Sequence, residues 1–259
     1  MTFQEQDLYD LKKAKTLLEN PGLAAKIANL LGTPIEKGFS LLPENWNQKI
    51  GELTRTALSK AVQAAVLTIR DSPGAESSNI WHKLAVATTG GIGGLFGLPA
   101  LSIELPISTT IMLRSIADIA RSEEENIQKI ESQIACIEVF ALGGASLGDG
   151  ASESGYFAIR ATLTQSISKA SEYIAKSGLT EEGAPALVRL ITQIAQRFSI
   201  QVSEKAAAQA IPAIGAAGGA IVNTLFIDHF QDMARGHFII RRLERKYDKE
   251  IVEEAYKSV

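Results

Sequence analysis

The sequence has few of the side chains on which catalytic and metal sites depend. Its 259 residues include one cysteine, Cys136, and three histidines. A single cysteine excludes an internal disulfide and fits a reducing compartment, and its apolar surroundings, IACIEVF, are typical of a small buried side chain rather than of a reactive thiol. The first residues show no basic segment followed by an apolar core, so we expect no secretory signal and a cytoplasmic location.

The sequence also lacks an excess of positive charge. Its formal net charge is −3 and its pI is about 5.7, values that argue against a general nucleic-acid-binding protein, which needs a basic face. Hydrophobic residues make up 46% of the chain and charged residues 21%, proportions typical of a globular protein with a sizeable core. The mean hydropathy of +0.07 is low for a protein that crosses a membrane many times.

Strand signals are missing as well. No segment alternates apolar and polar residues over five or more positions, and no hairpin dipeptide separates two strand-like runs. Apolar residues recur instead at helical spacing, from Trp46 to Val66 and again from Tyr156 to Ile174. The predicted fold class is therefore all-α, a multi-helix bundle in which 1–40 form an N-terminal helical extension and 41–259 the main helical domain.

Local signals place two further helices. Ser122 and Glu125 have the spacing of a capping box, and the three acids at 123–125 would favour the N-terminus of a helix over 123–142. The last helix is predicted to leave the apolar stretch 206–227 and to run through Asp248.

Two glycine-rich apolar stretches organise the rest of the chain. Residues 84–113 carry one charge, Glu104, and residues 206–227 carry none. The charge-free lengths would suffice to cross the hydrocarbon core of a bilayer. However, small residues dominate both stretches, and the prolines at 99, 106 and 212 would interrupt backbone hydrogen bonds that lipid cannot replace. Insertion into lipid and burial in a helical bundle both stay open, and we favour a soluble or peripheral protein.

A short internal repeat links these stretches. Residues 106–121 and 220–235 share five identities in sixteen aligned positions. Both segments follow glycines with G-x-x-x-G spacing, which predicts glycine-faced helices packed closely about a pseudo-twofold axis. The aligned residues Arg114 and Asp228 have opposite charges, and we expect them to pair across that axis. The glycines concerned are Gly93, Gly97, Gly215 and Gly219.

A basic segment follows the second stretch. From Arg235 to Lys249 there are six lysines and arginines against two acids. A basic segment beside an apolar one suits the anionic inner leaflet of a membrane, although a solvated helix face is the alternative. The candidate membrane-surface residues are Arg241, Arg242, Arg245 and Lys246.

A carboxylate and imidazole cluster is the most chemical feature of the sequence. His229 and Asp232 share one face of a helix, whereas His237 lies two turns beyond His229, so one helix cannot supply every ligand of an ion. Glu104, with His82 nearby, would complete a divalent-metal site if the repeats pack as predicted. Glu104 and Asp232 are the candidate catalytic residues. A hydrogen-bonded network, or for Glu104 an ion pair with a helix-end arginine, is the alternative.

Two motifs resemble known signatures but lack their context. Residues 144–148 match the G-x-S-x-G nucleophile elbow around Ser146, which needs a preceding strand and a parallel sheet. The GGIGG sequence at 90–94 lacks the G-K-[ST] end of a phosphate-binding loop. We therefore predict neither a serine nucleophile nor a nucleotide site.

Three segments resemble the EcsC family, which is named after the third product of a bacterial ABC-exporter operon. They are WHKLAVATTGGIGGLFGLPALSIELPISTTIMLRSIADIAR at 81–121, CIEVFALGG at 136–144 and NTLFIDHFQDMARGHFIIRRLE at 223–244. The resemblance covers roughly residues 40–247. It implies a helical, bacterial, cytoplasm-facing protein suspected of membrane association, and it brings no established mechanism and no functional residues.

We therefore expect a non-enzymatic helical protein that acts at the cytoplasmic membrane surface, beside a transporter or in lipid or envelope homeostasis. The expected partners are anionic lipid and a transporter or other protein, with no nucleic acid and no cofactor. Two other classes stay open. One is a metal-assisted hydrolase that uses Glu104, His229, Asp232 and His237, and the other is a soluble scaffold whose apolar hairpin docks a protein partner.

Overall fold

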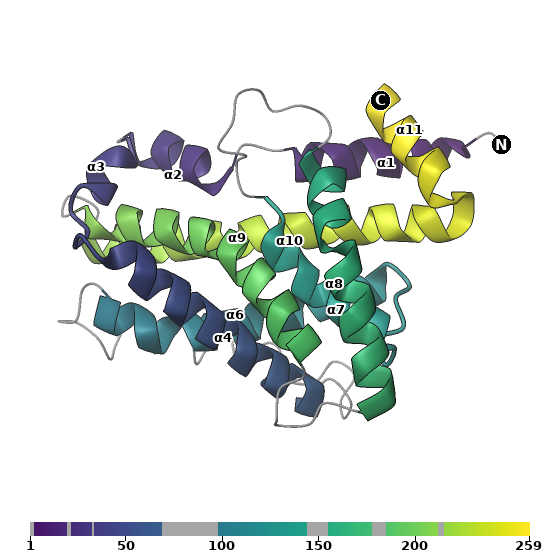
Figure 1. Cartoon of the computed structure of the whole chain (residues 1–259). Helices are drawn as coiled ribbons and strands as arrows, with labels where there is room; N and C mark the ends of the chain where they lie inside the picture. The colour runs from purple at the N-terminus through teal and green to yellow at the C-terminus, as the bar shows by residue number, and fades with distance from the viewer. Residues whose placement is uncertain are drawn as a thin grey trace.

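The computed structural model of the chain describes residues 3–19, 22–32, 34–68, 98–143, 155–177, 185–211 and 215–259. Over these ranges the chain forms ten α-helices and one 3-10 helix, with no strand, which confirms the all-α class (Figure 1). No helix in this part of the chain combines the length and the hydropathy that crossing a membrane requires.

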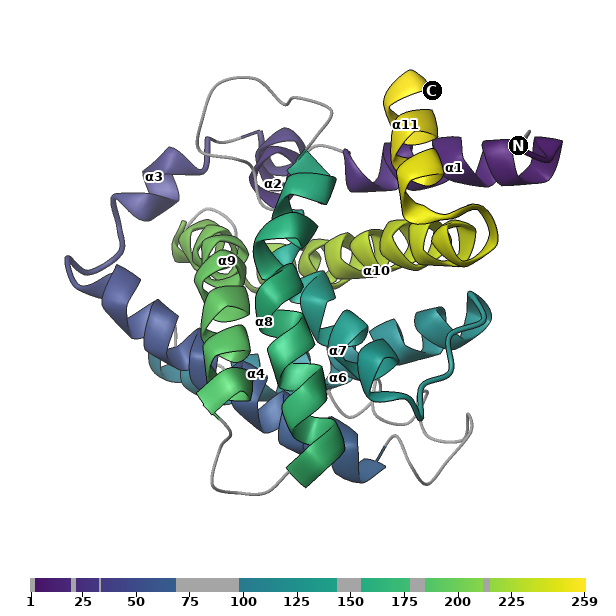
Figure 2. The ribbon, with the colours of Figure 1, turned by 45° about the vertical axis from the view of Figure 1, so that its right-hand side comes forward.

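The N-terminal and C-terminal helices lie on one side of the molecule. The first three helices are α1 (Glu5–Leu18), α2 (Leu23–Leu31) and α3 (Glu36–Phe39). The last helix, α11 (Lys249–Ser258), lies beside α1, and both pack on the second half of α10 (Gly215–Tyr247) (Figures 1 and 2). The extension predicted from the sequence is thus docked on the helices of the main domain.

Four long helices form the centre. They are α4 (Trp46–Thr68), α6 (Leu98–Ser122), α9 (Pro185–Ala210) and α10. Helix α4 packs against α6 and α9, and α10 packs against α6 and α9. Helices α6 and α10 lie side by side and run in the same direction, so that their first halves lie at the same end of the molecule (Figures 1 and 2).

Phenylalanine rings fill the centre of the core, where α9 and α10 meet the 3-10 helix η1 (Val139–Ala141). Phe140 lies 4.9 Å from Phe198 and 5.3 Å from Phe230, measured between ring centroids. Phe226 adds a fourth ring, 5.2 Å from Phe230. All four side chains are fully buried. Rings of this size dominate core energetics and fix how the helices that carry them pack.

The remaining helices cover this core. Helix α7 (Ile130–Glu138) runs directly into η1, and α8 (Gly155–Ser177) packs on α9 (Figure 2). The end of α8 at Ser177 and the helix over 156–174 agree with the sequence prediction.

Two predicted helix boundaries are wrong. The acids at 123–125 do not begin a helix: α6 ends at Ser122, Glu124 has a positive φ of 64°, and α7 begins only at Ile130. The Glu123 and Glu125 carboxylates bind arginines of α10 instead of free N–H groups at a helix start.

The last helix is the second correction. It stops at Tyr247, because Asp248 adopts a φ of 68° and turns the chain into a separate helix, α11.

Candidate functional site

The first halves of α6 and α10 carry large apolar side chains that remain exposed. Ile103 and Ile107, one turn apart on α6, are 54% and 45% exposed, and Ile221 on α10 is 43% exposed. All three lie at the end of the molecule where α6 and α10 begin, and each helix directly follows or continues a charge-free stretch of the sequence. We call these three residues the isoleucine face.

Glu104 lies between the two isoleucines of α6 in the sequence but is paired with the interior. Its Oε1 accepts a hydrogen bond from Nζ of Lys205 on α9 over 2.5 Å. The Lys205 side chain is fully buried and that of Glu104 is 16% exposed. The sequence predicted an ion pair with a helix-end arginine as one alternative for Glu104. The partner is instead a lysine that α9 buries.

The far end of α10 is also engaged within the chain. Arg241 and Arg245 lie one turn apart and share Glu125, with the Arg241 Nε and Arg245 Nη1 atoms 2.8 Å and 2.5 Å from its Oε1. Glu125 lies in the turn between α6 and α7, where its Oε2 also accepts a 2.7 Å hydrogen bond from Ser132. This side of α10 therefore holds the turn in place.

A neighbouring side of α10 binds α1. Arg242 lies 2.7 Å from Asp10 through Nη2 and 2.8 Å from Glu123 through Nε. Lys246 Nζ lies 2.6 Å from Asp7 Oδ2. The cations predicted as a membrane surface are therefore neutralised by acids of the same chain. We call these eight residues the basic-end cluster: Asp7, Asp10, Glu123, Glu125, Arg241, Arg242, Arg245 and Lys246.

The acids of the basic-end cluster are held in their charged form. Burial alone would raise the pKa of Asp7, but hydrogen bonds from Lys246 and Tyr247 outweigh burial and hold this pKa below its ordinary value. Burial likewise acts against the low pKa of Glu125, and the hydrogen bond from Arg241 contributes to outweighing it. The cluster is thus a set of formed ion pairs at neutral pH.

The four predicted metal ligands have separate partners. Glu104 binds Lys205, and Asp232 lies 3.4 Å from Lys26 and 3.2 Å from Arg235. Across the described ranges, no three histidine, cysteine or carboxylate side chains lie close enough together to hold one ion. The structure therefore does not bring Glu104, His229, Asp232 and His237 into one site.

His229 is buried against a turn. A Cβ added to Gly143, which has a φ of 76°, would lie 2.6 Å from the His229 Nε2 atom, so only glycine fits there. Neither ring nitrogen makes a well-formed hydrogen bond with a described residue. Burial and the nearby Lys26 charge lower the pKa of His229 to about 4, although the Gly143 backbone acts in the opposite direction. His229 is therefore neutral at physiological pH.

His237 belongs to a buried polar network that the sequence did not predict. Its Nδ1 lies 3.0 Å from the Tyr156 hydroxyl on α8, and its Nε2 lies 3.8 Å from Glu138 Oε2. Arg160, one turn after Tyr156, forms a two-pronged pair with Glu244 at 2.6 Å and 2.9 Å. The i,i+4 spacing of Tyr156 and Arg160 was visible in the sequence. Their docking on α10 was not.

Burial sets the protonation of this network. It lowers the pKa of His237 well below its ordinary value, with the Arg160 charge acting in the same direction, and it raises the pKa values of Glu138 and Tyr156. No groove or pocket found in the described structure opens onto these groups. Their geometry suits the joining of α7, α8 and α10 rather than contact with a substrate.

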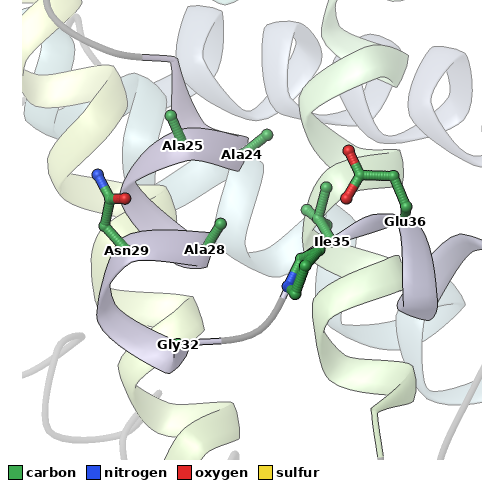
Figure 3. A pocket seen from close by; sticks show the side chains of 8 residues that line it. Ala24, Ala25, Ala28, Asn29, Gly32, Ile35 and Glu36 are labelled. Carbon is green, nitrogen blue, oxygen red and sulfur yellow. The ribbon is translucent and has the colours of Figure 1, made fainter.

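A shallow groove lies on the other side of the molecule, between α2 and α3. Its volume is about 510 Å³, and Ala24 and Ala28 point across it toward Ile35 and Glu36 (Figure 3). Next to α2, Glu204 of α9 is buried, and burial raises its pKa to about 7 even though the Ala24 backbone N–H donates a hydrogen bond to it. The groove wall is formed by small apolar side chains and carries few groups for chemistry.

The predicted pair of Arg114 and Asp228 is not formed between these two described side chains, and Asp228 is exposed. The hydrogen bond that crosses from α10 to α6 runs from Gln231 Nε2 to Ser115 Oγ over 3.0 Å. His82, Ser146 and the glycines at 93 and 97 lie outside the described residues. Around Gly219, no described atom lies within 4 Å of an added Cβ.

Comparison with known proteins gives one match. A model of the EcsC protein family matches residues 5–243, nearly the whole chain. The match begins at α1 and so takes in the helices over 1–40 that the sequence prediction had placed in an extension. No curated protein and no solved structure gave a significant match.

Proposed function

We infer that this chain, which belongs to the EcsC protein family, is a non-catalytic helical protein that works at the cytoplasmic surface of a membrane. It would act there beside a transporter or in lipid or envelope homeostasis. The observation that carries this proposal is the isoleucine face. Three exposed isoleucines lie at one end of the molecule, on helices that emerge from the charge-free stretches of the sequence.

The contact that we propose is apolar rather than electrostatic. Exposed isoleucines on neighbouring helices bury their side chains in the headgroup and acyl boundary of a bilayer and gain free energy in proportion to the area buried. The cations of the basic-end cluster already bind acids within the chain, so they contribute little to attraction by anionic lipid. Binding should therefore depend weakly on lipid charge and on salt.

Vesicle flotation tests this proposal. The protein is mixed with phosphatidylcholine vesicles, with and without phosphatidylglycerol, at low and at high salt. We expect flotation in all four conditions. The double variant Ile103→Asp/Ile107→Asp should lose it, because each carboxylate would have to be dehydrated at the contact.

A matched control separates this contact from a general loss of apolar surface. Tyr9 on α1 is 64% exposed and lies far from the start of α6 (Figure 1). The Tyr9→Asp variant should float like the unchanged protein. Protein that stays at the bottom of the gradient in all conditions would overturn the proposal, and flotation confined to anionic vesicles at low salt would assign the contact to the cations instead.

A further inference from the structure

The two apolar stretches carry one charge of each sign between them. Glu104 is the one charged residue in 84–113, and Lys205 is the residue directly before the charge-free stretch 206–227. They lie 101 positions apart, and the fold joins them. Neither position drew attention to the other in the sequence.

This pair lies where three helices meet. Lys205 reaches from α9 to Glu104 on α6 at 2.5 Å, and its Nζ lies 4.7 Å from the centre of the Phe226 ring on α10. The lysine is fully buried, whereas the glutamate is partly exposed. The pair therefore lies between the core and the isoleucine face.

Stability alone is a weak reason for a buried ion pair. Desolvation of the two charges largely offsets their attraction, and apolar residues of the same volume often serve equally well. What the pair provides here is position. Ile103 and Ile107 flank Glu104 on α6, so a carboxylate without its partner would turn toward water through the isoleucine face.

We propose that Lys205 is a positioning residue for the lipid contact. Its ammonium group draws the Glu104 carboxylate inward and cancels its charge, which leaves the isoleucine face free of charge at the bilayer surface. This inference rests on the proposed membrane function and adds a residue, 101 positions away in the sequence, that the contact requires.

Flotation of charge variants tests the inference. The Lys205→Met variant leaves Glu104 without its partner, and we expect vesicle binding to fall about tenfold, the cost of one charge at a bilayer boundary. The double variant Glu104→Gln/Lys205→Met removes both charges and should bind like the unchanged protein. Lys176→Met breaks an exposed pair on α8 and serves as the control, with no change expected.

The outcomes separate the inference from its premise. If the unchanged protein does not float, the membrane function fails and this inference fails with it. If the unchanged protein and the folded Lys205→Met variant float equally, the function stands and the inference is overturned. Should Lys205→Met not fold, as circular dichroism would reveal, the double variant decides: flotation by this folded, neutral protein supports the inference, and its absence overturns it.

Discussion

The two ends of α10 differ in what their side chains contact. At its start, an exposed isoleucine lies beside α6, and the charges nearby are a single internal pair. At its end, four cations bind four carboxylates from α1 and from the turn between α6 and α7. A count of charges along the sequence would assign the membrane contact to the second end. The contacts favour the first, because cations that are already paired within the chain have little left to offer a lipid headgroup.

The difference has a simple physical cause. The acids that neutralise the basic segment come from Asp7, Asp10, Glu123 and Glu125, which lie more than a hundred residues before it. A sequence window around Arg241 contains none of them. The basic end of α10 therefore stabilises the fold, whereas its apolar start is left for contact with a partner.

The largest effect on stability is expected at Glu125. The Glu125→Gln variant leaves Arg241 and Arg245 without their shared carboxylate, and we expect the free energy of unfolding to fall by about 3 kcal/mol, the low end for a broken buried pair because Arg245 is partly exposed. Urea denaturation measures this change. Glu253→Gln breaks an exposed pair on α11 and should cost no more than about 0.5 kcal/mol. Equal effects from the two variants would remove the distinction between the two kinds of pair.

The pH dependence of stability should have opposite signs in two regions. The lowered pKa values of Asp7 and Glu125 give the basic end stability that is fully present above about pH 4.5 and lost as pH falls further. Glu204 has its pKa raised to about 7, so its contribution falls as pH rises from about 4 through 7.

The Glu204→Gln variant isolates the second term. It should gain about 2 kcal/mol relative to the unchanged protein near pH 8 and nothing near pH 4, as measured by urea midpoints across this range. A difference between the two proteins that is independent of pH would contradict the assignment to Glu204.

Glycines at the two ends of α10 should respond differently to alanine. A Cβ at Gly236 would lie 2.6 Å from Leu18 Cγ and 3.1 Å from the Ala14 carbonyl oxygen, so we expect Gly236→Ala to destabilise the protein by about 1 kcal/mol as α1 is pushed away. Gly219→Ala meets no described atom within 4 Å and should stabilise the protein by about 0.5 kcal/mol through helix propensity. Thermal denaturation of both variants gives the two signs. The same sign for both would show that the packing of α1 does not decide the outcome.

The smallest effect on stability is expected on the isoleucine face. Because Ile221 is exposed, Ile221→Ser should change the free energy of unfolding by no more than about 0.5 kcal/mol. The same substitution removes a side chain from the proposed lipid contact, so vesicle binding should fall several-fold. A variant that loses stability but keeps its flotation would place Ile221 in the core and not at the contact.

Much of the fold follows from local patterns in the sequence. The apolar spacing over 46–66 and 156–174 lies within α4 and α8, because a helix that packs on a core needs one apolar stripe. The prediction for 123–142 was wrong because capping-box spacing cannot reveal a competing arginine on another helix. Residues 249–258 form α11, a helix that the sequence pattern did not suggest.

The site was harder to predict than the helices. Glu104 could be singled out because it is isolated among apolar residues, yet nothing local identifies Lys205 as its partner. The candidate ligands His229 and His237 share a helix with Asp232, but their rings are buried against Gly143 and Tyr156. Side-chain partners between helices depend on packing, which periodicity along one helix does not encode.

The ion pair between Asp7 and Lys246 has a consequence for synthesis, because these residues are 239 positions apart. Ribosomes add about 5–20 residues per second, so α1 leaves the ribosome roughly 10 to 50 seconds before the part of α10 that it packs on. During that time the side of α1 that carries Leu11 and Ala14, buried in the folded protein, has no native surface to cover it. Among the first residues made, α1 is therefore among the last to fold, and a chaperone that shields its apolar side until α10 emerges would raise the yield of native protein.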